Sequence, residues 1–197
     1  MTDDSIGPIS LTAPDGTVLA GNLARPAEPR AAAVLCHPHP AYGGDRHNIV
    51  VDALFRALPA AGLAALRFDF RGAGGGEQDD VLAALDRLAA EVPGVPLWLV
   101  GYSFGADVAL GVDDPRAAGW VAVAPPLRFG GTPTPARGDP RPALVLVPEH
   151  DAYSPPERTR AATADWPAVT VEVVPMADHF LAGAAGNVAA TVTSWLA

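Results

Sequence analysis

One serine lies in a pentapeptide whose residue types and spacing suit nucleophilic catalysis. Gly101-Tyr102-Ser103-Phe104-Gly105 fits the pattern Gly-x-Ser-x-Gly and stands between an apolar segment and the helix-like stretch 106–110. In such a motif the serine occupies a sharp turn from a strand into a helix, and flanking glycines avoid collisions where the chain doubles back. Because glycine is plentiful in this chain, the bare pattern is weak evidence, and Ser103 could merely cap a helix. The strand-to-helix context favours Ser103 as a nucleophile.

A serine hydroxyl is a poor nucleophile alone and needs an imidazole base, which in turn needs an acid that orients it. His179 is the histidine that follows the last predicted strand, although it could be a surface-loop residue paired with Asp178. Asp151 follows an apolar strand and precedes a proline-marked helix start, where an orienting carboxylate belongs. Asp151 could also only cap its turn, and Glu149 is the nearest rival acid. These positions favour Asp151 as the acid and His179 as the base.

Short apolar segments alternate with helix-like segments along most of the chain. An antiparallel hairpin over residues 8–24 precedes strands expected over residues 31–36, 63–70, 95–100, 119–124, 143–147 and 169–174. Helices are expected over residues 46–61, 81–90, 157–164 and 188–196. This alternation predicts a mostly parallel sheet of about seven to eight strands with helices on both faces. Ligands of such sheets bind at the carboxyl ends of the strands, where the polar residues singled out above are expected.

Two further motifs accompany the serine pentapeptide. They are His37-Pro38-His39-Pro40-Ala41-Tyr42-Gly43-Gly44 and Arg67-Phe68-Asp69-Phe70-Arg71-Gly72. From residue 30 onwards the chain resembles the α/β-hydrolases, and specifically small lidless bacterial hydrolases related to dienelactone hydrolase. The resemblance implies the α/β-hydrolase fold and cleavage of an ester-like bond, and the family's order of nucleophile, acid and base selects Ser103, Asp151 and His179. Dienelactone hydrolases proper carry cysteine where this chain has Ser103.

An oxyanion hole is the other part that acyl transfer requires, because negative charge develops on the former carbonyl oxygen. One expected donor is the backbone N–H of Phe104, the residue after the nucleophile. The second is expected from the loop after residues 31–36, in which two prolines have no N–H to give. His39 and Ala41 remain, with Tyr42 after them, and the resemblance to His-Gly-x loops elsewhere in the superfamily favours His39.

Aromatic residues near the expected strand ends are candidates for the substrate pocket. Tyr42, Tyr102 and Tyr153 are expected to bind substrate, and Phe104 and Phe129 are further possible walls, although such residues more often serve packing. The proline-broken segment 125–142 cannot form a helical lid, so no cap domain is expected. An open site of this kind favours small or soluble acyl substrates over long lipids.

Other ligand types are less compatible with the sequence. His37 and His39 could meet one metal ion, but the proline between them and the lack of further ligands argue against it. The glycines at 43–44 and 72–76 fit neither phosphate-binding nor dinucleotide-binding patterns, so no cofactor is expected. Arg71 could contact a substrate carboxylate, although a structural salt bridge is favoured. Asp107, in the first turn of the helix after Ser103, is expected to point away from the oxyanion.

Composition bounds the class of protein. The 197 residues, 49% of them hydrophobic and 18% charged, indicate one globular domain over residues 1–197. The net charge of −9 and the lack of a basic cluster exclude a nucleic-acid partner. The chain has a single cysteine, and its acidic amino terminus does not resemble a secretory signal. It also lacks an apolar stretch of about 20 residues. These features predict a soluble, cytoplasmic protein with no membrane association. The oligomeric state stays open.

These expectations combine into a serine carboxylesterase-like hydrolase that acts on a small-molecule ester through an acyl-enzyme. The same triad would also serve a thioesterase, a lactone hydrolase or an acyltransferase. A third hypothesis is a catalytically silent, ligand-binding member of the fold.

Overall fold

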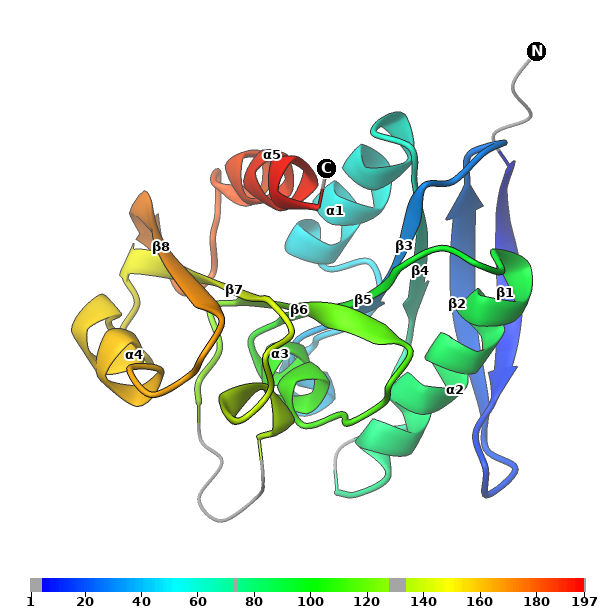
Figure 1. The fold of residues 1–197 in the computed structure, drawn as a ribbon, viewed down its shortest axis with the longest axis horizontal. Coiled ribbons are helices and arrows are strands. Elements are labelled where there is room, and N and C mark those ends of the chain that lie inside the picture. The colour runs from blue at the N-terminus through cyan, green and yellow to red at the C-terminus, as the bar shows by residue number, and fades with distance from the viewer. Residues whose placement is uncertain (1–4, 73, 128–133, 197) are drawn as a thin grey trace.

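The structure is a computed structural model, and it describes residues 5–72, 74–127 and 134–196. Its centre is an eight-stranded sheet with the order β1-β2-β4-β3-β5-β6-β7-β8 (Figure 1). The strands are β1 (Ser5–Thr12), β2 (Val18–Arg25), β3 (Ala31–Cys36), β4 (Leu63–Phe68), β5 (Leu97–Tyr102), β6 (Ala117–Val123), β7 (Ala143–His150) and β8 (Val169–Asp178). β1 and β2 form the antiparallel edge, and β3 to β8 run parallel. The predicted fold class is confirmed.

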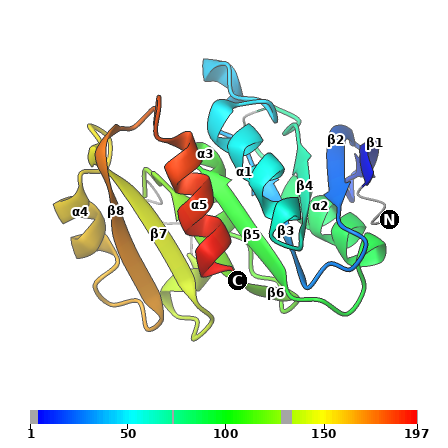
Figure 2. The same cartoon turned by 90° about the horizontal axis from the view of Figure 1, so that it is seen from above.

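Helices cover both faces of the sheet. They are α1 (Ile49–Ala60), α2 (Glu77–Glu91), α3 (Phe104–Leu110), α4 (Pro156–Ala162) and α5 (Ala185–Trp195). α1 and α5 lie side by side over one face, and α2 and α3 cover the other (Figures 1 and 2). Alternate residues of the buried strands divide between the two resulting cores: Val34 packs on the α2/α3 side and Leu35 on the α1/α5 side.

Some element boundaries differ from the sequence prediction for local reasons. α2 begins at Glu77, four residues before the predicted start, because its acidic first turn suits the positive end of the helix dipole. α1 begins three residues later than predicted, at Ile49, where the Asn48 side chain accepts a hydrogen bond from the N–H of Val50. β8 extends to Asp178, which brings its carboxyl end directly to His179.

The segment between β6 and β7 contains only a short 3₁₀ turn, Pro135–Arg137, in its described part. Phe129, a predicted pocket wall, lies outside the described residues. Within the described ranges, none of the helices is long and apolar enough to cross a membrane.

Candidate active site

Ser103 occupies the turn between β5 and α3 in a strained conformation. Its φ of 52° and ψ of −120° lie where non-glycine residues are uncommon, and such strain is concentrated at functional sites. A Cβ atom on Gly101 would lie 2.2 Å from the Gly105 carbonyl oxygen, and one on Gly105 would lie 2.4 Å from the Cys36 carbonyl oxygen. Glycine is therefore required at both flanks because the backbone approaches itself there.

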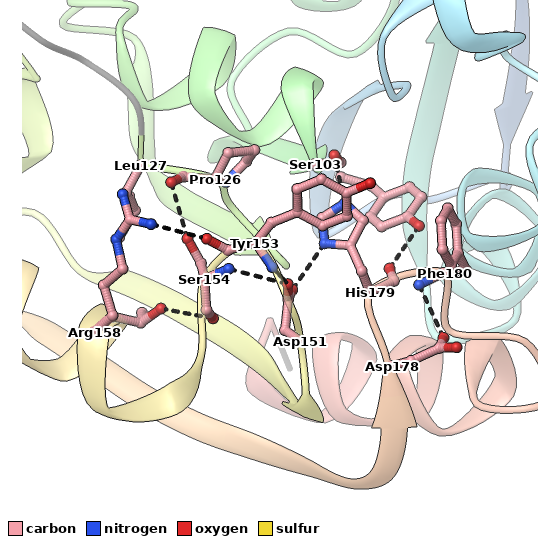
Figure 3. A network of polar contacts seen from close by, with 12 residues as sticks. Ser103, Pro126, Leu127, Asp151, Tyr153, Ser154, Arg158, Asp178, His179 and Phe180 are labelled. Carbon is pink, nitrogen blue, oxygen red and sulfur yellow. Dashed lines mark hydrogen bonds and ion pairs between the residues drawn. The ribbon is translucent and has the colours of Figure 1, made fainter.

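Three side chains that are remote in sequence form one hydrogen-bonded chain. Ser103 Oγ lies 2.9 Å from His179 Nε2, and His179 Nδ1 lies 2.8 Å from Asp151 Oδ2 (Figure 3). An ionised carboxylate only accepts hydrogen bonds, so Nδ1 of His179 carries a proton and donates a hydrogen bond to Asp151. Nε2 is then free of a proton and accepts from the Ser103 hydroxyl. The imidazole is thus in the tautomer that a general base requires.

Asp151 is fixed and ionised by its surroundings. The residue is 2% exposed, and its second oxygen, Oδ1, accepts hydrogen bonds from the N–H groups of Tyr153 at 2.8 Å and Ser154 at 3.1 Å. Burial acts to raise the pKa of Asp151, but the hydrogen bonds from His179 and from these two N–H groups outweigh it and hold the pKa below its usual value. The carboxylate is therefore charged at neutral pH.

The rival acids have other partners. Glu149 accepts a hydrogen bond from the N–H of Met176 at 2.7 Å. Asp178 accepts one from the N–H of Phe180 at 3.0 Å (Figure 3). Both carboxylates are exposed at the surface, whereas Asp151 is the acid that contacts the His179 ring.

The two predicted oxyanion donors come from segments that pack together. The His39 and Phe104 rings have centroids 4.7 Å apart, and Gly105 lies against the backbone of Cys36 and His37. Phe104 is the first residue of α3, so its N–H has no acceptor within the helix. The N–H of Ala41 is already bonded to His39 Nδ1 at 3.1 Å. The N–H of Tyr42 is likewise bonded to the His39 carbonyl at 3.0 Å, so His39 is the better candidate among the loop amides that the sequence left open.

Two solved structures of serine hydrolases have a similar fold. An alpha-beta serine hydrolase homologue from Coxiella burnetii is 30% identical, with a TM-score of 0.86 and coverage of 100% of this chain and 99% of that one. The chain belongs to the α/β-hydrolase family. XC6422 from Xanthomonas campestris, described as an α/β serine hydrolase without lid, is 29% identical, with a TM-score of 0.77 and coverage of 97% and 95% of the two chains.

Sequence comparison adds one relative of this α/β-hydrolase. An uncharacterized protein of Rickettsia prowazekii is 36% identical in an alignment 132 residues long, which covers 60% of this chain and 55% of the length of that protein. No family model matches the sequence. Taken together, the comparisons support a hydrolase of this fold, while the relation to dienelactone hydrolases stays a prediction.

The three tyrosines predicted to bind substrate have different surroundings. Tyr153 is 43% exposed, and its ring centroid lies 4.5 Å from that of His179. Tyr42 is 88% exposed and contacts the His39 ring at a centroid distance of 5.0 Å. The prediction that Tyr102 binds substrate is corrected, because the residue is only 4% exposed and its hydroxyl donates to the backbone carbonyl of His179 at 2.8 Å. It supports the loop that carries the base and does not form an open pocket wall.

His37 has a role that the sequence did not indicate. It is 1% exposed, its Nε2 accepts a hydrogen bond from the N–H of Phe70 at 3.0 Å, and its Nδ1 lies 2.6 Å from the Pro38 carbonyl oxygen. Nδ1 therefore carries the proton, and burial lowers the pKa of the imidazole. The neutral ring joins the loops after β3 and β4. No group of three potential metal ligands occurs among the described residues.

Arg71 and Asp107 make structural contacts on the α2/α3 side. Arg71 pairs with Asp15 and with the buried Asp80, at 2.7 Å from the latter, as the salt-bridge alternative predicted. Asp107 accepts a hydrogen bond from the N–H of Leu127 at 3.0 Å, so one of its oxygens is directed to the loop after β6. In the same loop the Pro126 carbonyl accepts from Ser154 Oγ at 2.9 Å (Figure 3).

Proposed function

We propose that this α/β-hydrolase cleaves carboxylic esters through a covalent acyl-enzyme on Ser103. The observation that carries the proposal is the hydrogen-bonded chain from Ser103 Oγ through the His179 ring to the buried, ionised Asp151. This arrangement performs general-base activation of a hydroxyl at neutral pH.

Acylation and deacylation use the same proton acceptor. As Ser103 Oγ bonds to the ester carbonyl carbon, its proton passes to His179 Nε2, and the carbonyl electron pair moves to the oxygen. Collapse of this tetrahedral intermediate breaks the bond to the alcohol oxygen, which takes the proton from Nε2. A water molecule then gives a proton to Nε2 while its oxygen bonds to the acyl carbon, and breakage of the bond to Oγ returns the proton to Ser103.

The remaining parts of the site suit developing charge. The N–H groups of Phe104 and His39 stabilise the oxyanion, and Asp151 stabilises the imidazolium that forms while Nε2 holds the second proton. Oxyanion donors of this type each contribute about 3 kcal/mol. Tyr153 beside His179 and Tyr42 beside His39 contact the substrate, and their exposure favours small or soluble acyl groups over long lipids.

The test is turnover of p-nitrophenyl esters of increasing acyl length, with an acyl thioester of matched acyl group as comparison. Ser103→Ala is expected to reduce kcat by about 10⁴-fold or more, as loss of a triad member does. Ser194→Ala, which alters an exposed serine on α5, is the matched control and is expected to retain wild-type turnover. Equal turnover of Ser103→Ala and wild type would contradict the proposal, and a strong preference for the thioester would identify a thioesterase instead.

A further inference from the structure

The loop that carries His179 reaches the nucleophile from a distant strand. Ser103 follows β5, His179 follows β8, and β6 and β7 lie between those two strands in the sheet. Within the described ranges, two side-chain hydrogen bonds join the nucleophile turn to this loop. One is the reactive bond between Ser103 and His179, and the other runs from the Tyr102 hydroxyl to the His179 backbone carbonyl at 2.8 Å.

The first of these bonds cannot hold the loop throughout the reaction. Once Ser103 is acylated, Oγ is an ester oxygen without a proton to donate to His179 Nε2. Water must then occupy the place of the serine hydroxyl as donor to Nε2. The Tyr102 bond uses the backbone carbonyl, which takes no part in proton transfer, and so it persists in the acyl-enzyme.

Strained backbone on both sides of His179 increases the need for an external restraint. Met176, near the end of β8, and Leu181, in the loop after His179, have φ values of 56° and 55°, which non-glycine residues seldom adopt. Such conformations persist only where surrounding contacts enforce them. The Tyr102 ring is buried in the α1/α5 core, in the same cluster as Leu181, and its burial raises the pKa of the hydroxyl so that it remains a donor.

We propose that Tyr102 is a positioning residue that holds His179 in place for hydrolysis of the acyl-enzyme. The proposal rests on the proposed ester cleavage and adds a step-specific role for the residue before the nucleophile. In the free enzyme the Ser103 hydroxyl still helps to hold the imidazole, so acylation depends less on Tyr102 than deacylation does.

Tyr102→Phe tests this role because it removes one oxygen atom and leaves the buried ring. Loss of one buried hydrogen bond is expected to slow deacylation about fivefold. Stopped-flow kinetics with p-nitrophenyl acetate separates the burst, which reports acylation, from the steady state. We expect kcat and KM to fall together, kcat/KM to stay near the wild-type value and the burst to become more pronounced.

A matched control removes another buried hydroxyl that donates to a backbone carbonyl. Thr163 is 1% exposed, and its Oγ1 donates to the Thr159 carbonyl at 2.9 Å, away from the nucleophile turn. Thr163→Val is therefore expected to lower thermal stability to a similar extent without changing kcat or KM. A purely structural role of Tyr102 would lower the titratable fraction of sites and kcat while leaving KM unchanged.

The outcomes separate the two proposals. Equal slowing of acylation and deacylation in Tyr102→Phe, or no change in either, contradicts the positioning role while ester cleavage stands. A wild-type protein that forms no acyl-enzyme contradicts both. If Tyr102→Phe fails to fold, the positioning role is tested by amide hydrogen exchange of residues 176–184 in the wild type, before and after phosphonylation of Ser103. The exchange rates are expected to be the same in both states, because the Tyr102 bond remains when the Ser103 hydroxyl is blocked. Faster exchange in the phosphonylated protein overturns the positioning role.

Discussion

Replacing Asp151 with asparagine probes the orientation of the base with little change in shape. Asp151 Oδ1 accepts two backbone N–H bonds, from Tyr153 and Ser154. An asparagine must keep its carbonyl oxygen on that side, since its NH₂ group would otherwise face two donors. The NH₂ group then points at His179 Nδ1, which must become an acceptor. The proton moves to Nε2, and the imidazole can no longer accept the Ser103 proton.

The size of the effect follows from this change of tautomer. Loss of the correct tautomer in a triad lowers kcat by about 10⁴-fold, equivalent to about 5 kcal/mol of transition-state stabilisation. The two backbone hydrogen bonds of Asp151 are retained, and the bond to His179 is reversed and loses its charge, so the free energy of unfolding is expected to fall by only about 1 to 3 kcal/mol. The variant should therefore fold and bind substrate while losing turnover.

The assay is steady-state hydrolysis of p-nitrophenyl acetate together with thermal unfolding. Asp178→Asn is the matched control, because Asp178 is an exposed carboxylate beside the base that caps the N–H of Phe180. It should keep kcat within about twofold, because the Asp178 carboxylate is exposed to solvent, which screens its charge, and the His179 ring is held by Asp151 instead. An Asp151→Asn variant that retains a tenth of wild-type kcat, or an Asp178→Asn variant that loses as much as Asp151→Asn, would refute the reasoning.

Three further predictions concern the supports of the site. Gly105→Ala places a Cβ atom 2.4 Å from a backbone carbonyl oxygen and should cost about 3 kcal/mol or prevent folding, whereas Gly186→Ala, where a Cβ atom has open space, should leave the melting temperature unchanged or higher. Burial lowers the pKa of His37 in the folded state, so the stability that its neutral ring provides is present above pH about 6.5 and is lost as the pH falls through the folded-state pKa. The free energy of unfolding of His37→Gln, measured with denaturant at several pH values, should lack this loss at low pH. A pH dependence equal to that of the wild type would contradict the prediction. Ser154→Ala removes the bond to the loop after β6 and should cost about 1 kcal/mol in thermal unfolding, while a loss below 0.3 kcal/mol, roughly the scatter of such measurements, argues against that contact.

The sequence predicted the parts of the site that local rules control. Steric limits at a sharp turn explain Gly101 and Gly105, and the position of His179 after the last strand follows from the alternation of elements. Because Pro38 and Pro40 have no backbone N–H, they could be excluded as oxyanion donors, which left fewer candidates in that loop. Each of these inferences needs only neighbours along the chain or the order of the strands.

The roles of Tyr102 and His37 could not be predicted because they depend on loops from separate strands. Tyr102 reaches a carbonyl on a loop that crosses the ends of two intervening strands. His37 accepts from the N–H of Phe70, which is near only because β4 lies beside β3 in the sheet. Neither contact has a periodicity or spacing of its own. The single domain, the cytoplasmic location and the subgroup of the family stay predictions.

Site-resolved labelling with a fluorophosphonate probe tests the central claim most directly. The account predicts one adduct, mapped by tandem mass spectrometry to Ser103, absent in Ser103→Ala and formed much more slowly in His179→Ala. Labelling of another residue, or equal labelling rates in the wild type and His179→Ala, would contradict activation of Ser103 by His179.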